Sequence, residues 1–325
     1  MSPVAPFAVT AGWGVDRLLG EPPTKMHPVA LFGAAMTKLE QPLYGDDRAR
    51  GVVYTAVGVG VGAAVGVLAR KSAGPMVSTA LVSWLAMAGK MLESESRRVA
   101  EALDAGDVVE ARQRVGRLVG RQTDGLDESD IARAVIESLA ENTTDAVVAT
   151  MFWGAIAGAS GAAIHRCINT MDAMVGHHNP RFERFGWASA RLDDLANWLP
   201  ARLTTVAVIV ARPRRAVDVV RTVRRDAARH PSPNGGLVEA AFAAALGLQL
   251  GGSNTYDGKV DDRGLLGDGN RPIGSDIDRA VVLARHVTVA SLAMTTAALL
   301  IEGLLVGRWT RRQRCSSAIP PDVAS

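Results

Sequence analysis

Residues 133–164, RAVIESLAENTTDAVVATMFWGAIAGASGAAI, join a polar helical pattern directly to an apolar segment. Arg133, Glu137 and Glu141 are four residues apart and therefore share one face of a predicted helix. The nineteen residues 146–164 that follow carry no charge. A solvated row of salt bridges would explain the charged face by itself. Polar groups packed this densely beside an apolar segment instead favour a functional site.

Two further clusters of Asn, Asp and Arg follow the same apolar segment. Asn169 and Asp172 are three residues apart, and Asp193 and Asp194 precede Asn197 by four and three residues. At helical spacing, the members of each cluster converge on one side. Solvation alone does not explain three such clusters at the ends of apolar segments. On the helix face next to that of Glu137, the first cluster continues with Ser138, Asn142 and Asp145.

The composition of the 325 residues predicts an all-α, polytopic integral membrane protein with amphipathic cytoplasmic helices. Hydrophobic residues make up 48%, charged residues only 21%, and the mean hydropathy is +0.11. The net charge of +3 is small and its arginines are dispersed, so no nucleic-acid footprint is present. Cys167 and Cys315 are too few and too far apart in sequence to indicate a disulfide framework.

Several charge-free segments are candidates for membrane helices. In the segment 51–69, Gly58, Gly62 and Gly66 recur every four residues, which allows close packing of helices in lipid. The N-terminal segment has no basic region before its apolar core, so we predict a retained helix rather than a cleaved signal. The candidate segments are 3–20, 51–69, 76–89, 146–164, the short 203–211, and 287–307.

Charge between these segments predicts the orientation. The basic, hydrophilic stretch 90–130 is expected in the cytoplasm, and the basic, amphipathic stretch 212–229 suits a membrane surface. The Gly- and Asp-rich residues 251–274 are expected to form a loop. If every apolar segment spans, the polar clusters lie on opposite faces of the membrane, so one short segment is expected not to span fully. Residues 1–310 are predicted to form one membrane domain, followed by a disordered tail at 311–325.

Short motifs occur in a fixed order along the chain. They are Asp16-Arg17-Leu18-Leu19-Gly20-Glu21-Pro22, His27-Pro28-Val29, Gly120-Arg121-x-Thr123, Arg133-Ala134-x-Ile136-Glu137-Ser138-x-Ala140-Glu141-Asn142-x-x-Asp145, Phe152-Trp153, Asn169-Thr170-x-Asp172-x-Met174-x-Gly176, Phe185-Gly186, Ala190-Arg191-Leu192-Asp193-Asp194, Pro200-Ala201-Arg202-Leu203-Thr204, His230-Pro231-Ser232-Pro233-Asn234-x-Gly236, Glu239-Ala240-Ala241, Leu246-Gly247 and Leu250-Gly251-Gly252. Together they resemble the CobD/CbiB family of cobalamin-biosynthesis membrane proteins, the adenosylcobinamide-phosphate synthases. The resemblance covers roughly Asp16 to Gly307. The family usually has Asp, Tyr and Arg where this chain has Gln122, His177 and Ala30.

The resemblance implies formation of one amide bond. The ring-D propionate of adenosylcobyric acid is joined to (R)-1-amino-2-propanol or its O-phosphate, giving adenosylcobinamide or its phosphate. The family is described as using ATP and Mg²⁺. The chain has no Gly-x-x-x-x-Gly-Lys-Ser/Thr loop, so ATP binding rests on the resemblance alone.

The polar clusters supply candidates for each role in that reaction. Mg²⁺ prefers oxygen ligands, arginines suit phosphates, and a general base must take a proton from the ammonium. Glu137, Glu141 or His230 is the candidate base, and the catalytic set also includes Asn142 and Asp145. Substrate and phosphate binding is assigned to Arg121, Arg133, Asn169, Asp172, Arg191, Arg202 and Asn234. Mg²⁺ is assigned to Asp193, Asp194 and Asn197, with Glu141, Asn142 and Asp145 as the alternative set.

A non-catalytic membrane protein is the alternative function, either a transporter or a signalling protein like the AmpE relatives of the family. Polar groups at membrane depth suit transport as well as catalysis. Transporters commonly contain paired repeats, and this sequence has no internal repeat. The synthase reading predicts an inner-membrane protein with its main loops in the cytoplasm. Its expected partners are a corrinoid, aminopropanol or its phosphate, and the lipid bilayer, with no nucleic acid.

Overall fold

Helices form most of the chain in the computed structural model, which describes residues 5–23, 26–120, 122–177, 179–256 and 259–316. The predicted helical architecture is confirmed apart from one pair of strands. A π-helical turn, Thr143–Val148, joins α6 to α7. The helices are α1 (Ala5–Leu19), α2 (Pro28–Leu43), α3 (Arg48–Ala86), α4 (Gly89–Asp104), α5 (Val108–Val115), α6 (Glu128–Asn142), α7 (Ala149–Val175), α8 (Trp187–Ala196), α9 (Trp198–Ala211), α10 (Ala216–Asp226), α11 (Gly235–Leu246) and α12 (Gly274–Ser316).

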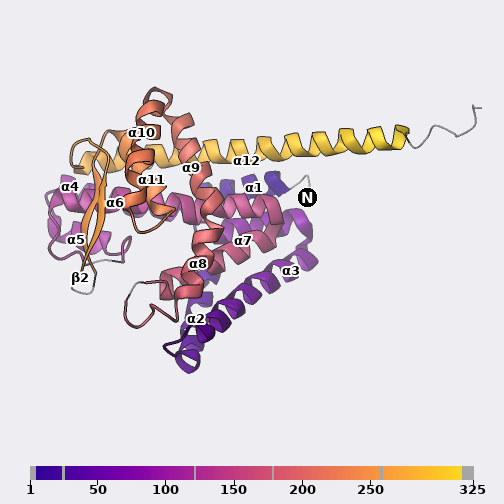
Figure 1. Cartoon of the computed structure of the whole chain (residues 1–325), viewed down its shortest axis with the longest axis horizontal. Helices are drawn as coiled ribbons and strands as arrows, with labels where there is room; N and C mark the ends of the chain where they lie inside the picture. The colour runs from indigo at the N-terminus through magenta and orange to yellow at the C-terminus, as the bar shows by residue number, and fades with distance from the viewer. Residues whose placement is uncertain (1–4, 24–25, 121, 178, 257–258, 317–325) are drawn as a thin grey trace, which may run out of the picture.

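The helices α3 and α7 each contain a glycine at which the chain reverses. Gly74 in α3 has φ 73° and ψ 171°, and Gly158 in α7 has φ 63° and ψ −150°. A Cβ atom at Gly161 would lie only 2.2 Å from the carbonyl oxygen of Trp153. Residues eight apart in a continuous helix are about 12 Å apart along the axis. Each helix is therefore a hairpin of two arms, and Figure 1 shows α3 turning back on itself.

The glycine stripe predicted in residues 51–69 packs directly against the second arm of α7. A Cβ atom at Gly62 would lie 2.9 Å from the Cα atom of Ile164, and one at Gly66 would lie 2.3 Å from the Cα atom of Ser160. At Gly58 it would meet the sulfur of Met171 at 2.2 Å. The predicted close approach of two helices is confirmed, because no larger side chain fits at these contacts.

The reversal at Gly158 corrects the expectation that residues 146–164 form one straight span. Asp145 lies before this segment and Asn169 after it, so a straight helix would hold them at opposite ends. In the structure the amide nitrogen of Asn169 lies 3.5 Å from the carboxylate of Asp145. The clusters meet because one glycine with positive φ turns the chain back, and the segment that reverses is the long 146–164 and not, as was predicted, one of the short segments.

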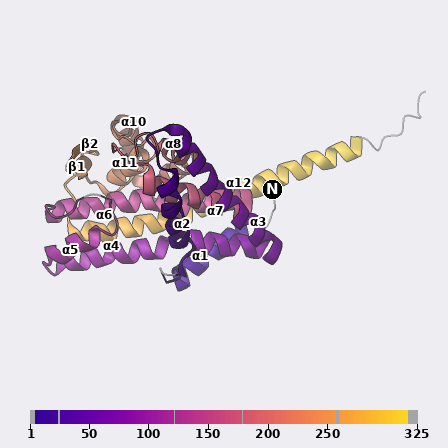
Figure 2. The ribbon, with the colours of Figure 1, turned by 90° about the horizontal axis from the view of Figure 1, so that it is seen from below.

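The other end of the molecule is a bundle built around α4, α5, α6, α11 and α12. Figure 2 shows α4, α6 and α12 lying alongside one another. Their inward side chains, including Val135, Phe242 and Val281, are fully buried in the largest apolar core. The helix α12 extends well beyond this bundle (Figure 1). Residues 311–316, predicted as part of the tail, continue that helix, and residues 317–325 lie outside the described residues.

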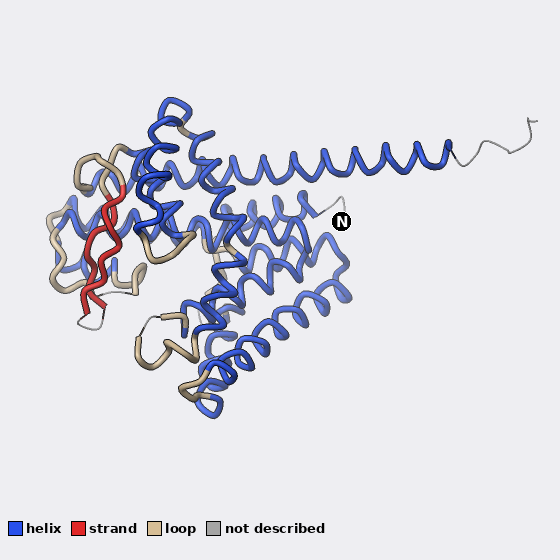
Figure 3. Tube along the Cα trace, in the orientation of Figure 1, coloured by secondary structure: helices blue, strands red, loops and turns tan. Residues whose placement is uncertain are grey.

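A β-hairpin replaces the first part of the loop that was predicted for residues 251–274, and residues 267–273 form a loop as predicted. Strand β1 (Leu250–Tyr256) pairs antiparallel with β2 (Lys259–Leu266), with a register shift between Gly251 and Ser253. Figure 3 shows the strands at the end of the molecule away from the free end of α12. The prediction missed them because glycines with positive φ, at 251, 252 and 264, interrupt the alternating pattern of a strand.

Among the described residues, three helical stretches are long and apolar enough to cross a membrane: 48–104, 128–175 and 274–302. In α3 the side chains of Val53, Val57 and Leu68 are exposed, as expected for a lipid-facing surface. The predicted amphipathic stretch 212–229 contains α10, which buries Val219 and exposes Val217.

Candidate active site

The charged face of α6 is buried against other parts of the chain. The helix begins where the carboxylate of Asp127 accepts a hydrogen bond from the backbone N–H of Asp130 at 2.7 Å. One turn on, Arg133 lies 3.3 Å from Glu137, as the four-residue spacing predicted. The two side chains are only 11% and 4% exposed. A solvated row of salt bridges is therefore excluded as the explanation of this face.

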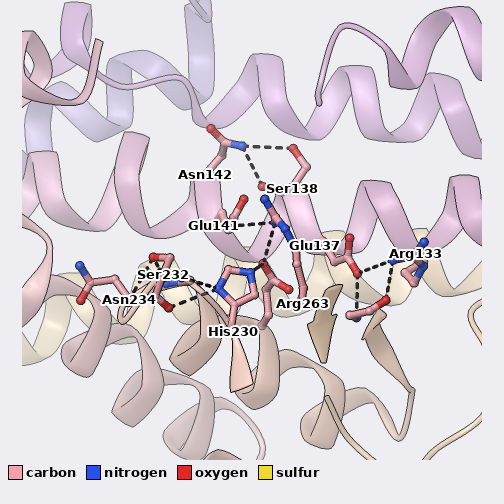
Figure 4. Close-up of polar contacts among 12 residues, drawn as sticks. Arg133, Glu137, Ser138, Glu141, Asn142, His230, Ser232, Asn234 and Arg263 are labelled. Atoms are coloured by element: carbon pink, nitrogen blue, oxygen red, sulfur yellow. Dashed lines mark hydrogen bonds and ion pairs between the residues drawn. The ribbon is translucent and has the colours of Figure 1, made fainter. Parts of the chain in front are cut away.

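Arg133 and Glu137 hold the first strand of the hairpin in place. The backbone N–H of Gly251 donates to Glu137 at 2.8 Å, and Arg133 donates to the carbonyl oxygen of Gly251. Arg133 was predicted to bind phosphate. In the structure it contacts backbone and carboxylate groups that dock β1 on α6 (Figure 4).

Asn142, predicted as catalytic, lies on another side of α6 from His230 (Figure 4). Its side-chain amide donates to the carbonyl oxygen of Ser138 at 3.0 Å and to the Ser138 hydroxyl at 3.1 Å. That hydroxyl in turn donates to the carbonyl oxygen of Leu118 at 2.9 Å. The structure therefore places Asn142 in a local helix contact rather than with the other catalytic candidates.

Glu141 faces His230, Glu239 and Arg263, which come from three other parts of the chain. The His230 Nε2 atom lies 3.4 Å from the Glu239 carboxylate, and the Arg263 guanidinium lies 3.9 Å from Glu239 and 4.0 Å from Glu141. Glu239 is fully buried. Burial, reinforced by the nearby charges of Glu141 and Glu137, raises the pKa of Glu239 well above its ordinary value. Burial also lowers the pKa of His230, so its neutral form is favoured near pH 7.

The loop before α11 fixes the imidazole of His230. The backbone N–H of Ser232 lies 3.1 Å from the His230 Nδ1 atom, and the Ser232 carbonyl oxygen lies 3.2 Å from the same nitrogen. A Cβ atom at Gly235 would lie 2.9 Å from Glu141 and 3.0 Å from His230, so only glycine allows this approach. Asn234 donates to the carbonyl oxygen of Asp194 at 2.8 Å, which ties the loop to α8.

A second polar cluster forms where α7, α8 and the π-helical turn meet. Asn169 bridges two carboxylates, at 3.5 Å from Asp145 and 3.5 Å from Asp193. Asn197 donates to the other oxygen of Asp193 at 2.9 Å, and His165 lies 3.0 Å from the Asn197 carbonyl oxygen. Members of all three predicted clusters therefore meet in space.

A cavity of about 40 Å³ connects the two groups of side chains. Burial, followed by the charge of Asp172, raises the pKa of Asp193 to about 7. An ionised carboxylate in such a position is costly unless a cation offsets its charge. The cavity is lined by Glu141, Thr144, Asp145, Asp193, Asn197, Ser232, Asn234, Gly235 and Val238.

The structure does not bring the other predicted arginines into this cavity. The Arg191 side chain is 68% exposed and lies 3.7 Å from the carboxylate of Asp194. Asp194, which was predicted as a metal ligand, does not line the cavity either. Arg202 stacks over the ring of Trp198 at 3.9 Å. Arg121 lies outside the described residues.

Sequence reasoning left out Glu239, Arg263, His165, Arg166 and Glu21. Arg166 donates to the Asn169 carbonyl oxygen at 3.2 Å and thus reaches the second cluster. His165 and Arg166 are the first ionisable residues after the charge-free segment, a position that signals function in an apolar environment. Burial raises the pKa of Glu21 to about 7, although the charge of Arg166 partly offsets this. The N-terminal motif therefore lies next to the central stretch.

The fold and site define a helical protein with helices of membrane-spanning length and a buried, carboxylate-rich polar centre. The sequence profile of the CobD/Cbib protein family matches residues 9–284. The Cobalamin biosynthesis protein CobD of Mycobacterium tuberculosis (strain ATCC 25618 / H37Rv) is 42% identical over 292 residues, covering 88% of this chain and 93% of that protein. The protein of the same name from Geobacter metallireducens is 41% identical over 296 residues, covering 87% and 93%. No solved structure matches. The chain belongs to the CobD/CbiB family.

Proposed function

We propose that the chain acts in cobalamin biosynthesis and joins the ring-D propionate of adenosylcobyric acid to (R)-1-amino-2-propanol or its O-phosphate. Membership of the CobD/CbiB family supports the pathway. The observation that carries the chemistry is the meeting of carboxylates and amides around a small cavity, with the imidazole of His230 beside Glu141. Such a site can hold a cation and accept a proton from an amine bound at its edge.

Proton transfer is the first task of these residues. The amine is an ammonium ion at neutral pH and must lose a proton before its nitrogen can form the C–N bond. His230 has a lowered pKa and lies beside Glu141 and Glu239, so its neutral imidazole can accept that proton. Glu141 lines the cavity and is the second candidate base.

Activation of the propionate is the second task, and it requires ATP and Mg²⁺ in this proposal. The donors around the second cluster fit Mg²⁺, because Asp145, Asp193 and Asn197 present oxygen atoms within one buried group. Bound ATP and Mg²⁺ would supply the activation that makes a carboxylate reactive toward an amine. Arg166 and Arg263 are the cations nearest the two clusters and would orient anionic groups of the substrates.

The size of the cavity limits what can enter. About 40 Å³ holds water or a small ion, whereas pockets that enclose whole ligands are typically about 300–1,000 Å³. We therefore expect the corrin ring and the amine to bind outside this cavity, with the propionate and the amine nitrogen approaching its edge near Glu141 and Asp145.

We place the protein in the cell membrane with the polar site toward the cytoplasm. Three helical stretches are long and apolar enough to cross a bilayer. The basic residues of α4 and α5, among them Arg97 and Arg112, lie with the bundle and would follow the positive-inside rule.

Membranes or purified protein supplied with adenosylcobyric acid, ATP, Mg²⁺ and each amine in turn test the proposal by mass spectrometry. The expected product is adenosylcobinamide or its phosphate, and it should disappear when ATP is omitted. Glu141→Gln and Asp193→Asn are expected to lower the rate at least a hundredfold, the scale of a lost acid–base group. Glu101→Gln, on the exposed side of α4, is the matched control.

Wild-type rates in both site variants would overturn the assignment of the site. Absence of product with either amine, from protein shown to be folded, would overturn the synthase function and favour a non-catalytic membrane protein.

A further inference from the structure

Glu141, His230 and Glu239 are arranged as ligands of a metal ion. One ligand atom from each residue lies within 4.8 Å of the others. The three side chains come from α6, from the loop before α11 and from α11 itself. The fold therefore brings them together from positions 141, 230 and 239, although they share no motif.

Unsatisfied polar atoms point into the space between these residues. Glu239 is fully buried, and among the described residues neither of its carboxylate oxygens accepts a hydrogen bond. The Nε2 atom of His230, whose side chain is 1% exposed, also has no hydrogen-bond partner there. Buried polar atoms are normally satisfied, so this arrangement needs an explanation.

The two ring nitrogens of His230 face different groups, Nε2 toward the carboxylates and Nδ1 toward the backbone of Ser232. A ligating imidazole usually donates from its other nitrogen to a carbonyl or a carboxylate. Without a metal, the backbone N–H of Ser232 donates to Nδ1 at 3.1 Å, so the ring proton lies on Nε2, which faces Glu239 at 3.4 Å. A metal ion would displace that proton, and the Ser232 carbonyl oxygen, 3.2 Å from Nδ1, would then accept a hydrogen bond from the other tautomer.

The local charge also favours a cation. Glu141 and Glu239 lie close together, whereas Glu137, on the same face of α6, is paired with Arg133. Arg263 is the neighbouring positive charge, but its guanidinium is 3.9–4.0 Å from the two oxygens, beyond a good hydrogen bond. A divalent ion between the carboxylates would satisfy atoms that this contact leaves unsatisfied.

The geometry points to a divalent transition-metal site formed by Glu141, His230 and Glu239, distinct from the Mg²⁺ ligands proposed around Asp193. Imidazole nitrogen suits Mn²⁺ or Zn²⁺ better than Mg²⁺, which prefers oxygen alone. The three protein ligands leave coordination positions for water or substrate. A role in catalysis rests on the proposed function, whereas metal binding does not depend on it. A bound ion would occupy the His230 Nε2 atom and an oxygen of Glu141, and these atoms could not then act as the bases proposed above.

Titration of the purified, chelator-treated full chain with Mn²⁺, followed by electron paramagnetic resonance, tests this site without measuring activity. Among the Mn²⁺ ions that wild-type protein binds, one is expected to show coupling to an imidazole nitrogen. Glu239→Gln is expected to weaken binding at least tenfold, and His230→Ala is expected to remove the nitrogen coupling. Zn²⁺ should displace the Mn²⁺ at lower concentration than Mg²⁺ does.

Arg263→Gln is expected to change the affinity for Mn²⁺ in the opposite direction. Removing the neighbouring positive charge should strengthen Mn²⁺ binding if the carboxylates are ligands. Two substitutions outside the site serve as controls. They are Glu110→Gln, where Glu110 pairs with Arg114, and His286→Gln, at an exposed position of α12. Neither control should alter the affinity, and an unfolding midpoint for each variant shows whether it is folded.

Two results would overturn the metal site formed by Glu141, His230 and Glu239. One is wild-type affinity and nitrogen coupling in both Glu239→Gln and His230→Ala. The other is Mn²⁺ binding that is lost in Asp193→Asn but kept in Glu239→Gln. Loss of the amide product alone would instead bear on the proposed function.

Discussion

Gly158 is expected to control both the stability of the α7 hairpin and the assembly of the site. Its φ of 63° and ψ of −150° lie in a region that is essentially restricted to glycine. A side chain there costs about 1–3 kcal/mol in backbone strain. The new Cβ atom of Gly158→Ala would also lie 3.2 Å from the hydroxyl of Thr79, closer than ordinary contact.

The two effects are partly offset by the smaller conformational freedom of alanine in the unfolded chain, about 0.4–1 kcal/mol. A net loss of about 2 kcal/mol is expected for Gly158→Ala. For 325 residues, with an unfolding entropy of about 2.1 cal/mol/K per residue, that lowers the unfolding midpoint by about 3 °C. Activity should fall as well, because Asp145 and Asn169 meet only when the chain reverses at Gly158.

Thermal unfolding of purified protein in detergent measures this change, with Gly60→Ala as the matched control. Gly60 is an exposed helical residue of α3, and a Cβ atom there would meet nothing within 4 Å. Alanine is the better helix former, so the control should be unchanged or slightly more stable. Equal midpoints for the two variants would refute the argument that positive φ at Gly158 makes the hairpin.

Two further predictions concern buried carboxylates. Glu21, with a pKa of about 7 against an ordinary 4.5, binds protons more readily in the folded chain, so stability should fall as pH rises from about 4.5 to 7. Glu21→Gln should abolish this pH dependence, which amounts to roughly 3 kcal/mol of unfolding free energy across that range. Unfolding midpoints measured from pH 4.5 to 7 test this, and an unchanged pH dependence would contradict the assignment. Glu137→Gln should cost about 1.5–3 kcal/mol, because the charged acceptor of the Gly251 N–H is lost. Hydrogen exchange at Gly251 should then accelerate, whereas exchange there in Glu101→Gln should match wild type.

Local patterns in the sequence predicted much of the fold and part of the site. The four-residue spacing of Arg133, Glu137 and Glu141 identified the buried polar face of α6, and the spacing of Gly58, Gly62 and Gly66 identified a close helix contact. Both predictions succeed because helical periodicity fixes which side chains share a face. The hairpin of β1 and β2 was missed because its glycines hide the strand pattern, and its position depends on hydrogen bonds to α6.

By itself, the sequence determined the helical class, the apolar segments and the residues from which a polar site could be built, because composition and periodicity are local properties of the chain. The tertiary structure alone decided which of those residues meet. One backbone angle at Gly158 places Asp145 beside Asn169, and the packing of α11 against α6 places Glu239 beside Glu141 and His230. Contacts between residues far apart in sequence depend on how whole elements pack, and that packing is decided by the sum of many small interactions rather than by any motif.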